Sequence, residues 1–230
     1  MGHLTKLDTA HGQISAWRAE PTQIPLGAIV VIQEIFGVNT HIRSVADDFA
    51  KEGYLALAPA YFDVIEAGIE LDYDAGGITK GRELITALGL EKATDITAAA
   101  ASFLAGQDTS NRTSSALQTR VGTVGYCWGG TVALLAALRL GLPSASYYGA
   151  RNVPFLQEPP QAPVIFHFGE RDASIPPEML AKHREHLPQM PLHTYSAGHG
   201  FNCDVRADYD AASAALARQR TLAFFSENLA

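Results

Sequence analysis

The stretch Val121–Gly130, VGTVGYCWGG, predicts a buried strand, a sharp turn and the start of a helix. Within it, Gly125, Cys127 and Gly129 match the pattern Gly-x-nucleophile-x-Gly, with cysteine where serine is usual. This motif places the nucleophile on a strained turn at the end of a strand, and its glycines let the strand and the helix approach closely. We therefore expect Cys127 to be a reactive nucleophile; the alternative is a structural cysteine in a glycine-rich turn.

Short apolar runs rich in β-branched residues alternate with helical patterns along the rest of the chain. The predicted strands are 28–32, 54–59, 121–126, 144–149, 162–172 and one that begins at 192, and the predicted helices are 40–53, 79–89, 92–107, 131–141, 176–187 and 207–229. This alternation predicts an α/β fold, in which a mostly parallel sheet is covered by helices on both faces. Ligands of such sheets bind at the carboxyl ends of the strands, where Cys127 is expected.

The composition is that of an ordinary globular protein, with 47% hydrophobic and 18% charged residues in a chain of 230. We expect one domain over residues 1–230. The net charge of −7 argues against nucleic acid or an anionic membrane as a partner. The N-terminal segment alternates polar and apolar residues without an apolar run long enough for a signal peptide, and two cysteines make no disulfide framework. A cytoplasmic location follows as an expectation.

Two later loops supply the partners that a nucleophilic cysteine needs. α/β-Hydrolases place the nucleophile, the acid and the histidine in that order along the chain. Asp172 follows a predicted strand and is the expected acid, with Glu170 as the fallback. His199, which has a glycine on each side, would accept the proton of Cys127 and be oriented by the acid.

The other histidines carry no functional prediction, and no metal is predicted. His183 and His186 lie one turn apart on one predicted helix, but no third ligand is suggested beside them. His3, His11 and His41 are expected near the surface or at the start of a helix.

From about Ile14 to Phe225 the chain resembles the dienelactone hydrolase (carboxymethylenebutenolidase) family. The resemblance is carried, in the family's order, by QEIFGVN (33–39), GYCWGG (125–130), YYG (147–149), FGERDASIP (168–176), AGHGFNCD (197–204) and RTLAFF (220–225). It implies the α/β-hydrolase fold, with a mostly parallel central sheet of about eight strands and helices on both faces. It also implies an enzyme that hydrolyses lactones or esters without a cofactor.

The resemblance implies a catalytic triad of Cys127, His199 and Asp172. It also implies that the backbone N–H groups of Ile35 and Trp128 form the oxyanion hole, which holds the charge that develops on the substrate oxygen. Cys127 would attack the carbonyl carbon to form a thioester, which water activated by His199 would hydrolyse.

Glu34 matches the family carboxylate that holds the resting cysteine as a neutral thiol, and that moves and takes its proton when substrate binds. A carboxylate beside sulfur disfavours the thiolate, and its displacement removes that penalty. The alternative for Glu34 is a loop glutamate paired with a surface cation.

The predicted substrate contacts are Phe36, Arg82, Tyr147, Phe201, Cys203 and Arg206. For Tyr147 the alternative is packing within a strand. Family members that cleave dienelactone hold the substrate carboxylate with arginines, one of them four residues past the histidine. This chain has Cys203 at that position, with Arg206 three residues further on. The missing arginine argues against dienelactone itself as the substrate, while the hydrolytic residues are unaffected. A regulatory disulfide between Cys203 and Cys127 is not expected in a cytosolic chain.

The sequence therefore predicts a cysteine-dependent hydrolase of small-molecule lactones or esters, as a monomer or weak homodimer. The alternative is a general carboxylesterase or thioesterase whose substrate choice is set by the segment 63–80. An enzyme of the glutamine-amidotransferase kind fits less well, because it orders its histidine and acid differently along the chain. A binding module that has lost activity also fits less well, because all three triad residue types are present.

Overall fold

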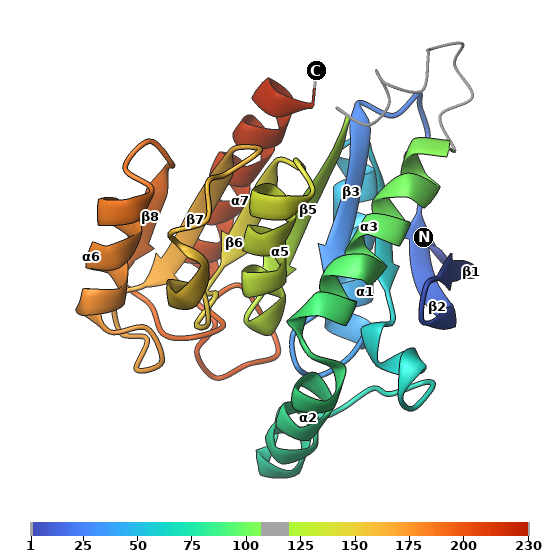
Figure 1. Cartoon of the computed structure of the whole chain (residues 1–230), viewed down its shortest axis with the longest axis horizontal. Helices are drawn as coiled ribbons and strands as arrows, with labels where there is room; N and C mark the ends of the chain where they lie inside the picture. The colour runs from blue at the N-terminus through green and yellow to red at the C-terminus, as the bar shows by residue number, and fades with distance from the viewer. Residues whose placement is uncertain (1, 107–119, 230) are drawn as a thin grey trace.

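The computed structural model describes residues 2–106 and 120–229. Across these residues, eight strands form one sheet in the order β1-β2-β4-β3-β5-β6-β7-β8 (Figure 1). The strands are β1 (His3–Thr9), β2 (Gly12–Ala19), β3 (Gly27–Ile32), β4 (Tyr54–Pro59), β5 (Val121–Tyr126), β6 (Ser144–Tyr147), β7 (Val164–Gly169) and β8 (Leu192–Tyr195). The β1–β2 and β2–β4 pairs are antiparallel, and the pairs from β4 through to β8 are parallel. The predicted mostly parallel sheet is confirmed.

Helices cover both faces of the sheet, as predicted. They are α1 (Thr40–Lys51), α2 (Ala75–Leu88), α3 (Leu90–Gly106), α5 (Trp128–Arg139), α6 (Pro177–His186) and α7 (Ala211–Asn228), with short 3-10 helices η1 (Tyr61–Val64) and η2 (Val153–Phe155). In Figure 1, α3 and α5 lie on the face toward the viewer and α1 and α7 lie behind the sheet. The helix predicted over 92–107 ends at Gly106, and its last predicted residue, Gln107, lies outside the described residues. None of the described helices is both long enough and apolar enough to cross a membrane.

The N-terminal segment forms the antiparallel edge of the sheet, although we predicted no individual strand there. Its alternation of polar and apolar residues places Leu7 and Ile14 in the core, each 1% exposed. Gly12, with a φ of 115°, makes the tight turn between β1 and β2.

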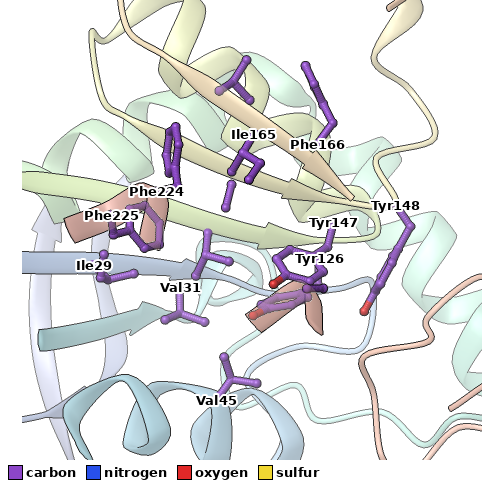
Figure 2. Packing of buried hydrophobic residues seen from close by; sticks show 14 of the residues in the cluster. Ile29, Val31, Val45, Tyr126, Tyr147, Tyr148, Ile165, Phe166, Phe224 and Phe225 are labelled. Atoms are coloured by element: carbon purple, nitrogen blue, oxygen red, sulfur yellow. The ribbon is translucent and has the colours of Figure 1, made fainter. Parts of the chain in front are cut away.

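The two faces of β3 pack against different helices. Ile29 and Val31 belong to one core cluster with Phe225 of α7, part of which is shown in Figure 2. Val30 and Ile32 belong to a second cluster with residues of α3 and α5. A strand buried on both faces must be apolar at every position, which explains the unbroken apolar run in this part of the sequence.

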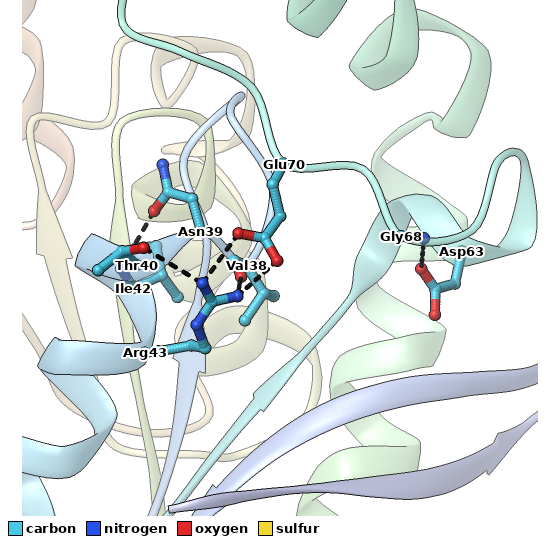
Figure 3. Close-up of polar contacts among 8 residues, drawn as sticks. All are labelled: Val38, Asn39, Thr40, Ile42, Arg43, Asp63, Gly68 and Glu70. Atoms are coloured by element: carbon cyan, nitrogen blue, oxygen red, sulfur yellow. Dashed lines mark hydrogen bonds and ion pairs between the residues drawn. The ribbon is translucent and has the colours of Figure 1, made fainter.

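The start of α1 anchors the segment that joins η1 to α2 (Figure 3). The side chain of Asn39 caps α1 by accepting a hydrogen bond from the backbone N–H of Ile42 at 3.2 Å. Arg43 donates to both carboxylate oxygens of Glu70, at 2.6 and 2.9 Å, and to the carbonyl of Val38 at 2.8 Å. One guanidinium therefore ties the start of α1 to the segment that contains Glu70.

Phe225 tests the packing of α7 against the sheet. Its side chain is 0% exposed, and its ring centroid lies 6.1 Å from that of Phe49 and 6.3 Å from that of Tyr54. We expect Phe225→Ala to lower the free energy of unfolding by about 3–5 kcal/mol, because it leaves a cavity among rings that cannot fully close it. Urea denaturation measures this loss. Leu216→Ala, at a 41% exposed position of the same helix, is the control and should change the value by less than about 0.5 kcal/mol. Equal losses in the two variants would contradict the packing.

Candidate active site

Cys127 lies on a strained turn between β5 and α5. Its φ of 55° and ψ of −117° fall in a region that residues with side chains rarely adopt. Its N–H donates to the carbonyl of Tyr147 at 3.0 Å, and its carbonyl accepts from the N–H of Gly130 at 3.0 Å. A Cβ atom on Gly125 would collide with the carbonyl oxygen of Gly129, so the strand and the helix meet without a side chain between them. The strand–turn–helix arrangement expected around Cys127 is present.

The structure brings the three predicted triad side chains together. His199 Nε2 lies 3.2 Å from Cys127 Sγ, and His199 Nδ1 lies 2.7 Å from Asp172 Oδ2. Asp172 is 4% exposed and also accepts from the backbone N–H of Ser174 at 2.8 Å. Glu170, the fallback acid, is exposed at the surface. The geometry favours Asp172 over Glu170 as the partner of the imidazole.

The charge of His199 is set by its two neighbours. Burial lowers the pKa of the imidazole, but the hydrogen bonds with Asp172 and with Cys127 outweigh burial and raise the pKa to about 10. The ring therefore keeps its proton at neutral pH while both hydrogen bonds are in place. An imidazolium in contact with sulfur stabilises the thiolate, which is the nucleophilic form of cysteine.

Glu34 and Arg206 form an ion pair beside the triad. Glu34 is 0% exposed; its Oε1 accepts from Arg206 Nη1 at 3.1 Å, while its Oε2 is buried without a hydrogen-bond partner among the described residues. Arg206, whose direction the sequence left open, thus turns inward. The expected resting contact between Glu34 and the thiol is not the one observed, because Cys127 bonds to His199 instead. A buried carboxylate gains more from a guanidinium than from a weak S–H donor.

The triad opens into a cavity of about 280 Å³ at the carboxyl ends of the strands. The predicted site residues that line it are Ile35, Phe36, Arg82, Cys127, Trp128, His199 and Arg206. Among the described residues, Arg151 also lines the cavity, so three arginines line it. The sequence analysis missed Arg151, although it follows β6 closely, and ligands of parallel sheets bind at the carboxyl ends of the strands. Three guanidinium groups make the cavity attractive to a carboxylate.

Three predicted substrate contacts lie away from that cavity. Tyr147 is 1% exposed and its hydroxyl is hydrogen bonded at 2.7 Å to a threonine of α7, while Phe201 and Cys203 are both 0% exposed. We correct these assignments, because all three side chains point into the protein interior. The tyrosine beside the triad is Tyr148, whose ring centroid lies 5.1 Å from that of His199. Both cysteines of the chain are free.

The segment 63–80 holds Phe36 at the wall of the cavity. The ring centroid of Phe36 lies 4.3 Å from that of Tyr73, and the carbonyl of Phe36 accepts from the N–H of Leu71 at 2.9 Å. The guanidinium carbon of Arg206 lies 5.9 Å from the Phe36 ring centroid and 6.0 Å from that of Tyr73. The cation is thereby fixed between two aromatic rings and one carboxylate.

Known proteins match this chain over almost its whole length. The model of the Dienelactone hydrolase family matches residues 14–229. A Synechocystis sp. protein provisionally named a carboxymethylenebutenolidase is 35% identical, over 94% of this chain and 93% of that protein. The carboxymethylenebutenolidase of Pseudomonas putida is 31% identical, over 90% and 88% of the two chains. The crystal structure of a provisionally assigned dienelactone hydrolase from Klebsiella pneumoniae is similar with a TM-score of 0.84 at 29% identity, covering 99% of this chain and 98% of that one.

Asp172→Asn tests the hydrogen bond that orients and charges His199. The amide cannot stabilise an imidazolium as a carboxylate does, so we expect kcat for p-nitrophenyl acetate to fall by roughly 10²-fold to 10⁴-fold. The wild-type kcat/KM should fall as the pH rises through about 10, where His199 loses its proton. In Asp172→Asn this alkaline limb should move to lower pH, because the group that raises the pKa most is gone. If Glu170→Gln showed these effects and Asp172→Asn did not, the acid would be Glu170.

Proposed function

The chain belongs to the dienelactone hydrolase family, and on that premise we propose that it cleaves its substrate with Cys127, His199 and Asp172 through a thioester intermediate. Family membership makes it a carboxylic ester hydrolase that acts on esters or lactones. The observation that carries the finer proposal is the continuous path of hydrogen bonds from Asp172 through His199 to the sulfur at the cavity.

The first half of the reaction forms the thioester. The thiolate of Cys127 attacks the carbonyl carbon, and the C=O electron pair moves to oxygen, where the backbone N–H groups of Ile35 and Trp128 would stabilise it, as the family resemblance implies. When the tetrahedral intermediate collapses, the C–O bond of the ester breaks and His199 donates its proton to the leaving oxygen. For a lactone, the leaving group stays attached to the acyl chain because the ring has opened.

The second half of the reaction hydrolyses the thioester. His199, now neutral, takes a proton from water as that water attacks the acyl carbon. Collapse of the second tetrahedral intermediate releases the acid and restores the thiolate beside an imidazolium. Asp172 holds the ring in one orientation through both halves and stabilises its charged form.

The charges around the cavity support a substrate that carries its own carboxylate. Arg82, Arg151 and Arg206 line the cavity, so Arg206 supplies a cation there although position 203 is a cysteine. A substrate carboxylate at Arg206 would compete with Glu34 for the guanidinium and so release Glu34, as the family resemblance implies for this residue. The alternative, a general carboxylesterase or thioesterase, is favoured by the cysteine at position 203.

Cys127 variants test the covalent step. We expect Cys127→Ala to lose all measurable hydrolysis of cis-dienelactone, trans-dienelactone and p-nitrophenyl acetate, because no other thiol faces the cavity among the described residues. Rapid quenching of the wild type with p-nitrophenyl acetate should give a protein whose mass is increased by one acetyl group, located on Cys127 by peptide mapping. Unchanged hydrolysis by Cys127→Ala would remove the proposed nucleophile.

Arg151→Met tests the carboxylate preference without breaking the Glu34–Arg206 pair. Loss of one charged hydrogen bond should raise KM for a carboxylate-bearing lactone by about 10-fold to 100-fold, while KM for uncharged p-nitrophenyl acetate stays the same. Arg184→Met, at an exposed position of α6 away from the cavity, is the matched control. Equal effects of Arg151→Met on both substrates, or turnover of aryl acetates alone by the wild type, would favour the general esterase.

A further inference from the structure

A second group of metal-ligating side chains lies outside the catalytic cavity. His41 Nδ1 lies 3.0 Å from Asp204 Oδ1, and one ligand atom from each of His41, Cys203 and Asp204 lies within 4.8 Å of the other two. Within residues 2–106 and 120–229, no other three His, Cys, Asp or Glu side chains meet this spacing. We propose that His41, Cys203 and Asp204 form a binding site for Zn²⁺.

The chemistry of the three side chains fits this ion. Imidazole nitrogen, cysteine sulfur and carboxylate oxygen are the ligands that zinc takes in proteins, and sulfur disfavours Mg²⁺ and Ca²⁺. A tetrahedral zinc with bonds of about 2.0–2.3 Å separates its ligand atoms by about 3.3–3.8 Å. Side chains already within 4.8 Å of one another therefore need only small rotations to close on the ion.

The contact with Asp204 identifies which ring nitrogen of His41 would bind the ion. His41 Nδ1 lies 3.0 Å from Asp204 Oδ1, so Nδ1 is the ligand atom and Nε2 keeps the proton of the neutral imidazole. The imidazole is held in place, because the His41 side chain is only 5% exposed. A separate cavity of about 240 Å³ is lined by His41, Asn202, Asp204 and Tyr209 among others, so it reaches two of the three ligands and has room for water as a fourth ligand.

Zinc at this site would tie α1 to the loop that carries the catalytic histidine. His41 lies in the first turn of α1, 163 residues before Asp204. The backbone N–H of Cys203 donates to Gly200, next to His199, at 2.9 Å, and the carbonyl of Cys203 accepts from the N–H of Arg206 at 3.1 Å. The loop therefore carries the proposed zinc ligand Cys203 between His199 and Arg206, which both line the catalytic cavity.

The ion must displace the proton of the Cys203 thiol. Burial, with the nearby charge of Glu34, raises the pKa of that thiol to about 11, against the effects of Tyr73 and Arg206, which lower it. Binding of zinc to the thiolate is expected to release this proton into solution. Proton release on titration with zinc is a signature that a surface carboxylate site would not give.

The experiment uses Cys127→Ala as the parent, so that the catalytic thiol cannot bind the metal. Titration with zinc chloride against a coloured chelator should give one site per chain, and cobalt chloride should give the near-ultraviolet charge-transfer absorption of a thiolate–cobalt bond. Adding Cys203→Ser, His41→Gln or Asp204→Asn to this parent should weaken zinc binding by at least about tenfold. Asp204 is 66% exposed, so its variant is not expected to disturb folding, and circular dichroism checks the other two.

A matched control comes from a second His–Asp pair that has no cysteine beside it. His11 Nε2 lies 2.9 Å from Asp95 Oδ2, and His11→Gln in the same parent should leave zinc affinity unchanged. Saturating zinc should raise the melting temperature of the parent and not that of its Cys203→Ser derivative. The proposal is overturned if zinc binds wild type but not Cys127→Ala, or if Cys203→Ser binds as tightly as the parent. Neither result would affect the proposed hydrolysis, which is measured through Cys127.

Discussion

The two hydrogen bonds of His199 are the interaction on which the rest of the site depends. The sulfur comes from the turn after β5, the carboxylate from the loop after β7, and the ring from the loop after β8. These three loops meet only because parallel strands bring their carboxyl ends to one edge of the sheet. A shift of register by one residue between β7 and β8 would turn alternate side chains to the other face and separate the acid from the ring.

The ion pair of Glu34 and Arg206 beside the triad affects which substrates the cavity can bind. Glu34 is buried against Arg206, and removing either partner of such a pair leaves an uncompensated charge in the interior, at a cost of about 3–5 kcal/mol. The second oxygen of Glu34 has no partner among the described residues, so the carboxylate keeps the capacity to accept another hydrogen bond. The pair is therefore stable at rest and can still respond to a new anion or a new donor.

Much of this arrangement was predictable from local sequence, and the failures have physical causes. Apolar runs identified the parallel strands, and the order Cys127, Asp172, His199 followed from the motifs around them. The choice between Tyr147 and Tyr148 failed, because which of two adjacent tyrosines faces the site depends on where the strand ends, here at Tyr147. The inward direction of Arg206 depends on a loop whose path local patterns do not encode. His41 lies at the start of a helix, as expected; its burial, at 7% exposed, and its contact with Asp204 depend on a loop far along the chain.

The backbone conformation at Cys127 restricts which nucleophilic residues this position can hold. A φ of 55° is tolerated by a side chain with one substituent on Cβ, but a β-branched side chain crowds the backbone in that conformation. Threonine, although it carries a hydroxyl, is thus excluded for steric reasons before its reactivity matters. Serine and cysteine both fit, and since they differ by a single atom, an exchange between oxygen and sulfur chemistry can occur at this turn without rebuilding the scaffold around it.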